Sequence, residues 1–485
     1  MVFSSLIFLY AFLPLSLLVY VLCKGREAKN MSLLVFSLIF YAWGEPKYVL
    51  LLMFMSLCSW FCALRVERAA SRKGKRAWVA VSCAIDIALI GFFKYAGLIC
   101  SVFGEVPEFI ANIALPIGIS FYTFQLLTYV VDVYRGDAEA QPSYLNVLLY
   151  ASLFHQCVAG PIVRYKTIAH ELFVQRDSRD LLSGISRFTV GLAKKTLLAN
   201  PCGALADQLL LSTDAASNAS LFADNLSTLS GLSALGAWVG VAAFMMQIYL
   251  DFSAYSDMAI GMGRMLGLHY LENFDYPYLS KTVTEFWRRW HISLGTFFRD
   301  YVYIPLGGRQ CSKARSVFNL FVVWALTGLW HGAHWNFVLW GLYFFVFILI
   351  ERLFLKRLFA KLHILPHIYL LFVVFAGWIL FHFTDVRLGW TVFLGLFGAN
   401  GNAASDFVSI TLLKNNVFLL AVSAIACTPL VKTMANGAGT RLRRSRSGER
   451  LFNLMAYIVF PIVLLLLSTA SLVGDSYNPF IYFQF

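Results

Sequence analysis

The sequence predicts an all-α, polytopic membrane protein, and three observations point to that class. Apolar residues make up 59% of the 485 residues and charged residues only 13%, whereas a soluble domain carries about 45–50% and about 25%. Mean hydropathy is +0.69. Apolar segments of helical length recur along the whole chain. This composition excludes a soluble enzyme, which needs polar surfaces, and a disordered chain, which needs low hydrophobicity.

The apolar segments predict about eleven transmembrane helices, because a helix needs about 20 residues to cross a bilayer. The first segment, at 3–23, has no basic stretch before it and no small-residue cleavage motif after it, so we expect a retained span. Segments too short to cross are expected to be re-entrant or interfacial. We find no internal repeat, which predicts one membrane-embedded domain over residues 1–485. The later segments lie at about 31–43, 47–64, 77–103, 110–130, 143–160, 183–200, 228–250, 252–268, 316–332, 336–355, 367–382, 388–400, 407–427 and 451–473.

Basic residues collect in short clusters between the apolar segments and account for much of the net charge of +13. Such clusters mark the cytoplasmic side of a membrane protein and contact lipid headgroups. They do not form the single stripe that a nucleic-acid partner would require. The clusters lie at 24–29, 65–76 and 441–450.

A polar stretch at 273–315 interrupts the apolar pattern and interleaves arginine with tryptophan and phenylalanine. We call it the arginine–tryptophan segment. Its aromatic residues share a face at helical spacing, which predicts a helix at the cytoplasmic interface. A simple membrane anchor is the alternative interpretation. The residues singled out here are Trp287, Arg288, Arg289 and Arg299.

Two carboxylates, Asp251 and Asp257, lie in an otherwise apolar run. Charged groups inside apolar spans are costly and mark functional candidates. Six positions apart, the two do not share a helical face. We therefore expect capping or buried hydrogen bonding rather than a paired acid and base.

The strongest anomaly is His331, which lies among small residues and tryptophans in the run 328–335 (GLWHGAHW). Histidine is well suited to moving protons at neutral pH. His334 follows at i+3, but without an acidic third ligand or an HExxH pattern we expect no metal site. A catalyst and a hydrogen-bonded core histidine remain open interpretations of His331. His291 is the second candidate. Because no GxSxG or cysteine acyltransferase motif is present, direct base activation of a hydroxyl fits better than a covalent enzyme.

Five motifs carry a resemblance to a known family. The chain resembles the membrane-bound O-acyltransferase superfamily and, within it, the bacterial alginate O-acetyltransferase membrane subunits. The motifs follow the family order over residues 1 to about 345, the end at 478–485 is also similar, and residues 357–450 match nothing distinctive. The motifs are 115–125 (LPIGISFYTFQ), 158–164 (VAGPIVR), 251–261 (DFSAYSDMAIG), 284–294 (TEFWRRWHISL) and 328–333 (GLWHGA).

The resemblance implies a catalytic His331 deep in a central tunnel, with His291 as the second family histidine. It implies acetyl-CoA as the donor substrate, no bound cofactor and a location in the bacterial inner membrane. The acceptor would be an extracytoplasmic, alginate-like polysaccharide or a periplasmic partner acetyltransferase. The expected substrate or acyl-CoA contacts are Trp287, Arg288, Arg289, Arg299, Trp330, Asp251 and Asp257. The alternatives are a transporter or channel that uses intramembrane His and Asp as relay groups, and a non-catalytic scaffold in exopolysaccharide secretion.

Overall fold

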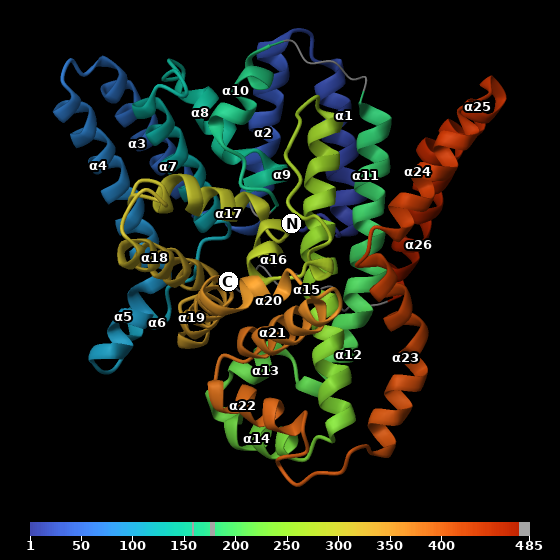
Figure 1. The fold of residues 1–485 in the computed structure, drawn as a ribbon. Coiled ribbons are helices and arrows are strands. Elements are labelled where there is room, and N and C mark those ends of the chain that lie inside the picture. Colours follow the sequence, from blue (N-terminus) through green and yellow to red (C-terminus); the bar gives the residue numbers. More distant parts are fainter. Residues whose placement is uncertain (158–159, 175–179, 475–485) are drawn as a thin grey trace. The chain divides into compact units, whose positions relative to one another are not determined.

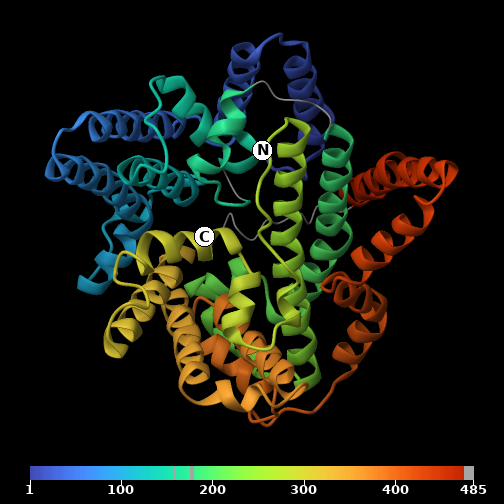
Figure 2. The ribbon, with the colours of Figure 1, turned by 45° about the horizontal axis from the view of Figure 1, so that its top comes forward.

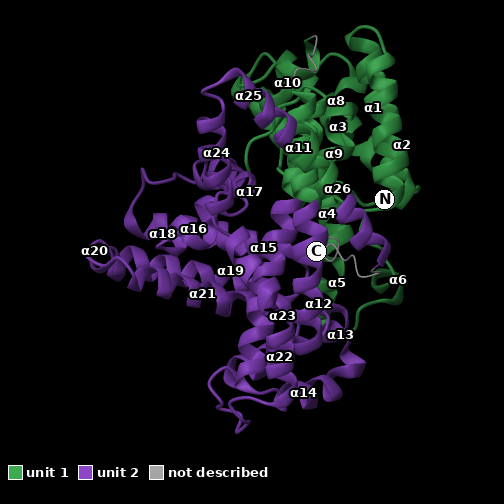
Figure 3. Ribbon diagram, turned by 90° about the vertical axis from the view of Figure 1, so that its right-hand side faces the viewer, with its two compact units in different colours: residues 1–192, 255–272, 457–465 green, residues 193–254, 273–456, 466–485 purple. Residues whose placement is uncertain are grey.

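The computed structural model describes residues 1–157, 160–174 and 180–474. The similar stretch at 478–485 and the start of the motif at 158–164 therefore lie outside the described residues. The chain divides into two compact units, which Figure 3 colours separately. The first unit contains residues 1–192, 255–272 and 457–465, and the second contains 193–254, 273–456 and 466–485.

The first unit is built from helices, and in it α3 packs against α4, α7 and α8 while α2 packs against α8 (Figure 1). The buried face of α7 carries Tyr122, Tyr129 and Leu126. The loop after α7 is tied back by Lys166 Nζ, which lies 2.7 Å from an Asp137 carboxylate oxygen. Its helices are α1 (Leu13–Leu22), α2 (Arg26–Gly44), α3 (Val49–Arg68), α4 (Arg72–Ile90), α5 (Ala96–Phe103), α6 (Glu108–Ala111), α7 (Ile119–Arg135), α8 (Tyr144–Ser152), α9 (Phe154–Cys157), α10 (Tyr165–Phe173) and α11 (Leu181–Ala193).

The second unit centres on the hairpin of α18 and α19, which also packs against α21 (Figures 1 and 2). Its helices are α12 (Asn200–Leu210), α13 (Thr213–Ser217), α14 (Phe222–Ser230), α15 (Ala234–Met265), α16 (Val283–Arg289), α17 (Ile292–Phe298), α18 (Lys313–His331), α19 (Trp335–Ile350), α20 (Lys356–Phe359), α21 (Leu365–His382), α22 (Val386–Gly395), α23 (Phe407–Ala426), α24 (Leu430–Leu442), α25 (Arg446–Leu454) and α26 (Phe460–Gly474). The ends of α15 and α26 contribute to the first unit.

Glycines set the close approach of α18 and α19. A Cβ added at Gly328 would collide with the carbonyl oxygen of Phe337, and one at Gly341 would collide with that of Trp324. Small residues at a helix interface permit such backbone contact. The end of α18, including His331, is thereby held against α19.

Seven helical stretches among the described residues are long and apolar enough to cross a membrane, which confirms the all-α, polytopic class. The expected number of about eleven crossings stays a prediction. A shorter apolar helix covers Phe8–Leu22. The seven are Val49–Arg68, Arg72–Phe103, Ala234–Met265, Trp335–Phe359, Leu365–His382, Phe407–Ala426 and Arg446–Gly474.

The apolar segments at 228–250 and 252–268 differ from expectation, because α15 runs through both as a single helix of 32 residues. The polar residues between them do not break the helix. Asp251 lies 2.8 Å from Lys195 Nζ, and the Ser253 hydroxyl donates to the Leu250 carbonyl. Polar side chains that find partners in this way can remain inside a buried helix.

We predict a local pH response in the first unit at His269, whose ring nitrogens lie 2.8 Å from Glu171 and 3.0 Å from Asp180. Hydrogen bonds to Asp180 and Glu171 raise the pKa of His269 above its usual value. A raised pKa in the folded state stabilises the fold below about pH 6.5, and this contribution is lost as pH rises through the folded pKa. Because the ring is about half exposed, the effect stays below about 1 kcal/mol.

Hydrogen exchange measured by mass spectrometry would test this response. We expect α10 to exchange faster as pH rises through neutrality, after correction for intrinsic exchange rates. His269→Gln should remove that pH dependence. His170 is an exposed histidine on α10 itself, and His170→Gln should leave the dependence intact. A dependence that survives His269→Gln would contradict the prediction.

Candidate active site

The two candidate histidines lie in one buried aromatic cluster of the second unit. His331 is the last residue of α18, and His291 lies between α16 and α17. Each is 2% exposed. Trp330 contacts both, with ring centroids 4.8 Å from His331 and 5.5 Å from His291. The structure therefore brings together two residues that are forty positions apart in the sequence.

Aromatic side chains from α19 and α21 surround His331. The Trp340 ring centroid lies 4.9 Å from His331 and that of Phe381 lies 5.4 Å away. Trp287 joins the same assembly through Trp340, at 5.3 Å. We call His291, Trp330, His331, Trp340 and Phe381 the histidine–tryptophan cluster. Such surroundings exclude water and strengthen any electrostatic interaction made inside them.

The backbone at His291 is unusual, because it adopts the left-handed conformation with φ 46° and ψ 55°. This turn separates α16 from α17, where the sequence had suggested one interfacial helix. Asn273 holds it: its carbonyl accepts from the Ile292 amide at 3.0 Å. Its side-chain oxygen accepts from the Ser293 amide and hydroxyl at 3.1 and 2.8 Å.

The same Asn273 oxygen lies 3.2 Å from His291 Nδ1. Since an amide oxygen can only accept, the proton of the neutral imidazole is placed on Nδ1 and the lone pair on Nε2. Burial lowers the pKa of His291, which favours this neutral form. Asn273 therefore sets both the position and the tautomer of the ring.

Glu351 anchors the start of α16, the helix that carries Trp287. Its carboxylate accepts from the Val283 amide at 2.5 Å and from the Thr284 amide and hydroxyl at 3.2 and 3.1 Å. Thr282 supplies a conventional cap by accepting from the Glu285 amide at 3.0 Å. A buried carboxylate at a helix start satisfies otherwise orphaned amides.

We predict that Glu351→Ala destabilises the protein by about 1–3 kcal/mol, because it leaves the buried amides of α16 without an acceptor. Glu351→Gln retains one acceptor oxygen and should lose less. Thermal unfolding of the purified protein would measure both losses, and hydrogen exchange should localise them to residues 283–291. Glu449→Ala removes an exposed glutamate from the first turn of α25 and serves as the control. Equal effects of the two alanine variants would contradict this role of Glu351.

The three arginines expected to contact acyl-CoA lie outside the histidine–tryptophan cluster. Arg288 and Arg299 are exposed, and Arg299 lies 2.6 Å from Asp300. Arg289 lies 2.8 Å from Glu285. Arg289 and Arg299 are thus partly neutralised by neighbouring carboxylates, whereas Arg288 is exposed on α16.

The two carboxylates of the 251–261 motif have separate basic partners, as expected for residues that do not share a helical face. In the second unit Asp251 is paired with Lys195. In the first unit an Asp257 oxygen lies 2.6 Å from Arg187. Beside Asp251, the Phe252 ring lies 4.7 Å from His291, so this part of the motif contributes packing to the cluster.

Sequence reasoning missed Asn273, Trp340, Phe381 and Glu351. One of them carried a usable signal: Glu351 is a carboxylate inside the apolar segment at 336–355, where such a group is costly. The others lacked one, because an asparagine in a polar stretch and aromatic residues in apolar helices are ordinary.

Comparison with known proteins gives a consistent result. Residues 49–393 match the family model of the membrane-bound O-acyltransferase family. The chain is 33% identical to the probable alginate O-acetylase AlgI of Azotobacter vinelandii over an alignment of 517 positions and to that of Pseudomonas aeruginosa over one of 538, with 100% of each chain covered. It is 29% identical to the peptidoglycan O-acetyltransferase of Helicobacter pylori, covering 83% of this chain and 80% of the relative.

These relatives are bacterial acyltransferases, and the seven apolar helices fit a multi-pass protein of the bacterial inner membrane. A family match over more than half of the chain, together with full-length relatives, identifies the activity class as O-acyl transfer. The chain belongs to the membrane-bound O-acyltransferase family.

Proposed function

We propose that this protein moves an acetyl group from cytoplasmic acetyl-CoA toward an extracytoplasmic polysaccharide, with His331 as the general base. The observation that carries the proposal is the burial of His331 and His291 against the same indole, that of Trp330. The resemblance of the 284–294 and 328–333 motifs supports the choice of these two histidines.

The chemistry requires one base and one leaving group. His331 removes the proton from the acceptor hydroxyl as the oxygen attacks the thioester carbonyl carbon, forming the new C–O bond. The C–S bond then breaks, and the CoA thiolate takes up the proton held by the imidazolium. The products are the acetyl ester and free CoA. His291 Nε2, which carries the lone pair, orients the acceptor hydroxyl by accepting its hydrogen bond.

The proposed entrance for CoA is the surface of the second unit that carries Arg288 and Arg299. Arg288 is exposed and would bind a CoA phosphate, and the exposed Arg299 would do so on release from Asp300. Trp287 connects this surface to Trp340 of the cluster. The roles of Asp251 and Asp257 are proposed as structural support for the motif rather than direct substrate contact, because each holds a basic partner.

For the acceptor we propose an alginate-like polysaccharide, or a periplasmic acetyltransferase that receives the acetyl group and modifies the polymer. Alginate is supported by the full-length relatives, which are probable alginate O-acetylases, and the Helicobacter pylori relative, a peptidoglycan O-acetyltransferase, is named for a different polymer. We further propose that residues 1–485 act as one membrane domain.

Inverted inner-membrane vesicles that contain the protein would test the donor and the direction of transfer. Acetyl-CoA with a labelled acetyl group is added outside, where the cytoplasmic face is exposed. We expect one CoA thiol released per acetyl group that reaches the vesicle interior, and no release from vesicles that lack the protein. Absence of protein-dependent CoA release would overturn the proposal and favour a transporter or scaffold.

A further inference from the structure

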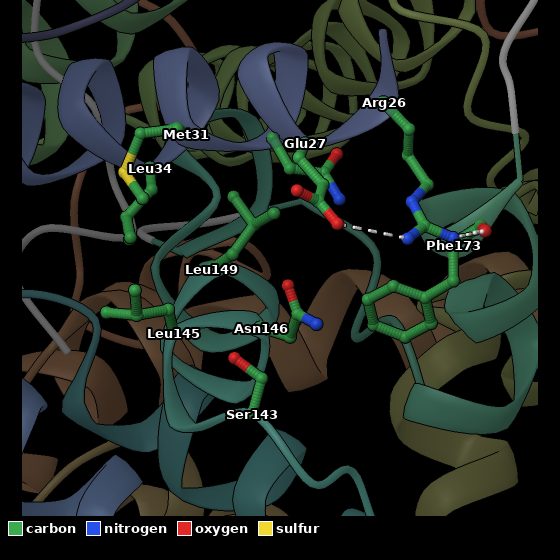
Figure 4. A pocket seen from close by; sticks show the side chains of 10 residues that line it. Arg26, Glu27, Met31, Leu34, Ser143, Leu145, Asn146, Leu149 and Phe173 are labelled. Atoms are coloured by element: carbon green, nitrogen blue, oxygen red, sulfur yellow. Dashed lines mark hydrogen bonds and ion pairs between the residues drawn. The ribbon is translucent and has the colours of Figure 1, made fainter.

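The first unit contains a cavity of about 280 Å³ between the first turns of α2 and α8 and the end of α10 (Figure 4). Its lining includes neither candidate histidine, and both histidines belong to the second unit. Its lining combines the polar side chains of Arg26, Glu27, Ser143 and Asn146 with apolar ones. The Phe173 ring lies on the side of Arg26, whereas the aliphatic side chains lie toward the other side. The aliphatic group is Met31, Leu34, Leu145 and Leu149.

The charged side of the cavity carries one positive and one negative group. Arg26 donates to the Phe173 carbonyl at 2.7 Å, which fixes its guanidinium at the mouth. Its other terminal nitrogen lies 3.6 Å from Glu27. The Glu27 side chain is 91% exposed, so this ion pair contributes little on its own, and Glu27 can turn toward a cationic group while Arg26 stays in place to bind an anionic one.

The apolar side of the cavity opens outward. Leu34 and Leu149 are buried and form its floor, whereas Met31 is 46% and Leu145 is 45% exposed. Arg26 follows the apolar helix Phe8–Leu22 by four positions, which puts the charged side at headgroup depth and the apolar side toward the acyl chains. A water-soluble ligand would not use these exposed apolar side chains.

We propose that this cavity binds a zwitterionic phospholipid with a primary ammonium, of the phosphatidylethanolamine class. Arg26 binds the phosphate, Glu27 binds the ammonium, and Ser143 and Asn146 donate or accept hydrogen bonds at the headgroup. Met31 and Leu145 contact the acyl chains. The neutral sum of the two charges matches this headgroup better than one with a net negative charge. Bound in this way, the lipid joins α2, α8 and the end of α10.

Native mass spectrometry of the purified, delipidated full-length protein would test the proposal. Phosphatidylethanolamine and phosphatidylglycerol with identical acyl chains are titrated separately. We expect half-saturation with phosphatidylethanolamine at about tenfold lower concentration, the size of one charge-assisted hydrogen bond. Equal affinity for the two lipids would overturn the proposal.

Two variants test the roles of the positive and the negative group one at a time. Arg26→Ala should weaken the binding of both lipids by about tenfold, because both carry the phosphate. Glu27→Gln should remove only the preference for phosphatidylethanolamine, and the exposure of this residue makes a folding defect unexpected. Arg387→Ala removes an exposed arginine paired with Asp385 in the second unit and should change neither affinity. Unchanged binding in Arg26→Ala would place the lipid elsewhere and overturn the assignment.

Water-soluble glycerophosphoethanolamine distinguishes a lipid site from a headgroup site. It lacks acyl chains, so we expect it to displace phosphatidylethanolamine only at concentrations at least about a hundredfold higher, since burial of a few methylene groups is worth that factor. Displacement at equal concentration would show that the apolar side contributes nothing and would overturn the assignment to a membrane lipid.

Discussion

Replacing His331 with alanine is expected to reduce acetyl transfer by about 10²–10⁴-fold, the usual contribution of a general base. The imidazole is buried against Trp330, Trp340 and Phe381, so solvent cannot readily take over its proton transfer. Polymer acetyl content in a strain that produces only the variant would give the first measurement. Protein-dependent CoA release in inverted vesicles would give the second.

A matched control separates chemistry from packing, because any buried histidine leaves a cavity when it is truncated. His382 is also 2% exposed and belongs to the same unit, and its Nε2 lies 3.1 Å from the Leu211 carbonyl. His382→Ala should reduce stability and the amount of inserted protein, but activity per inserted molecule should remain within about threefold. His291→Ala tests the second histidine. Normal acetylation by correctly inserted His331→Ala protein would refute the role of His331.

Removing one partner of the Lys195–Asp251 pair is expected to cost about 3–5 kcal/mol, because it leaves a buried charge uncompensated. Lys195 lies in the π-helical turn Lys194–Ala199 that precedes α12, and Asp251 lies in α15. Their atoms are 2.8 Å apart, and both side chains are almost completely buried. Lys195→Met should therefore lower the unfolding temperature of the purified protein and its amount in the membrane.

The double variant Lys195→Met, Asp251→Leu tests whether the loss comes from the unpaired charge. With both charges removed, most of the stability should return, since apolar replacement of a buried ion pair is often close to neutral. Arg387→Met at the exposed pair with Asp385 should cost less than about 1 kcal/mol. A double variant as unstable as Lys195→Met alone would show that packing or chain geometry, rather than charge, dominates at this position.

The fold class could be predicted from the sequence because apolar composition and segment length act locally along the chain. The boundaries of the helices were harder to predict from the sequence. The single helix α15 depends on Lys195, which lies 56 positions before Asp251 and neutralises it. Spacing along the chain cannot reveal such a partner, so the polar run looked like a break between two segments.

The candidate site, too, could be predicted from the sequence only in part. His331 and His291 stood out because titratable groups are rare against an apolar background. That they contact one indole could not be derived, since it depends on the meeting of α18 with the turn after α16. Asn273 was equally inaccessible: its role depends on the left-handed turn at His291, and histidine gives no signal for that conformation.

The left-handed backbone at His291 carries an energetic cost that the packing of its side chain must offset. A side chain other than glycine pays about 1–2 kcal/mol for this conformation. His291→Gly would relieve that strain, but it would also empty the space that the ring fills against Phe252 and Trp330. The buried contacts of the imidazole therefore hold in place a turn that its own backbone disfavours, and the residue that costs strain is also the one that fixes the turn.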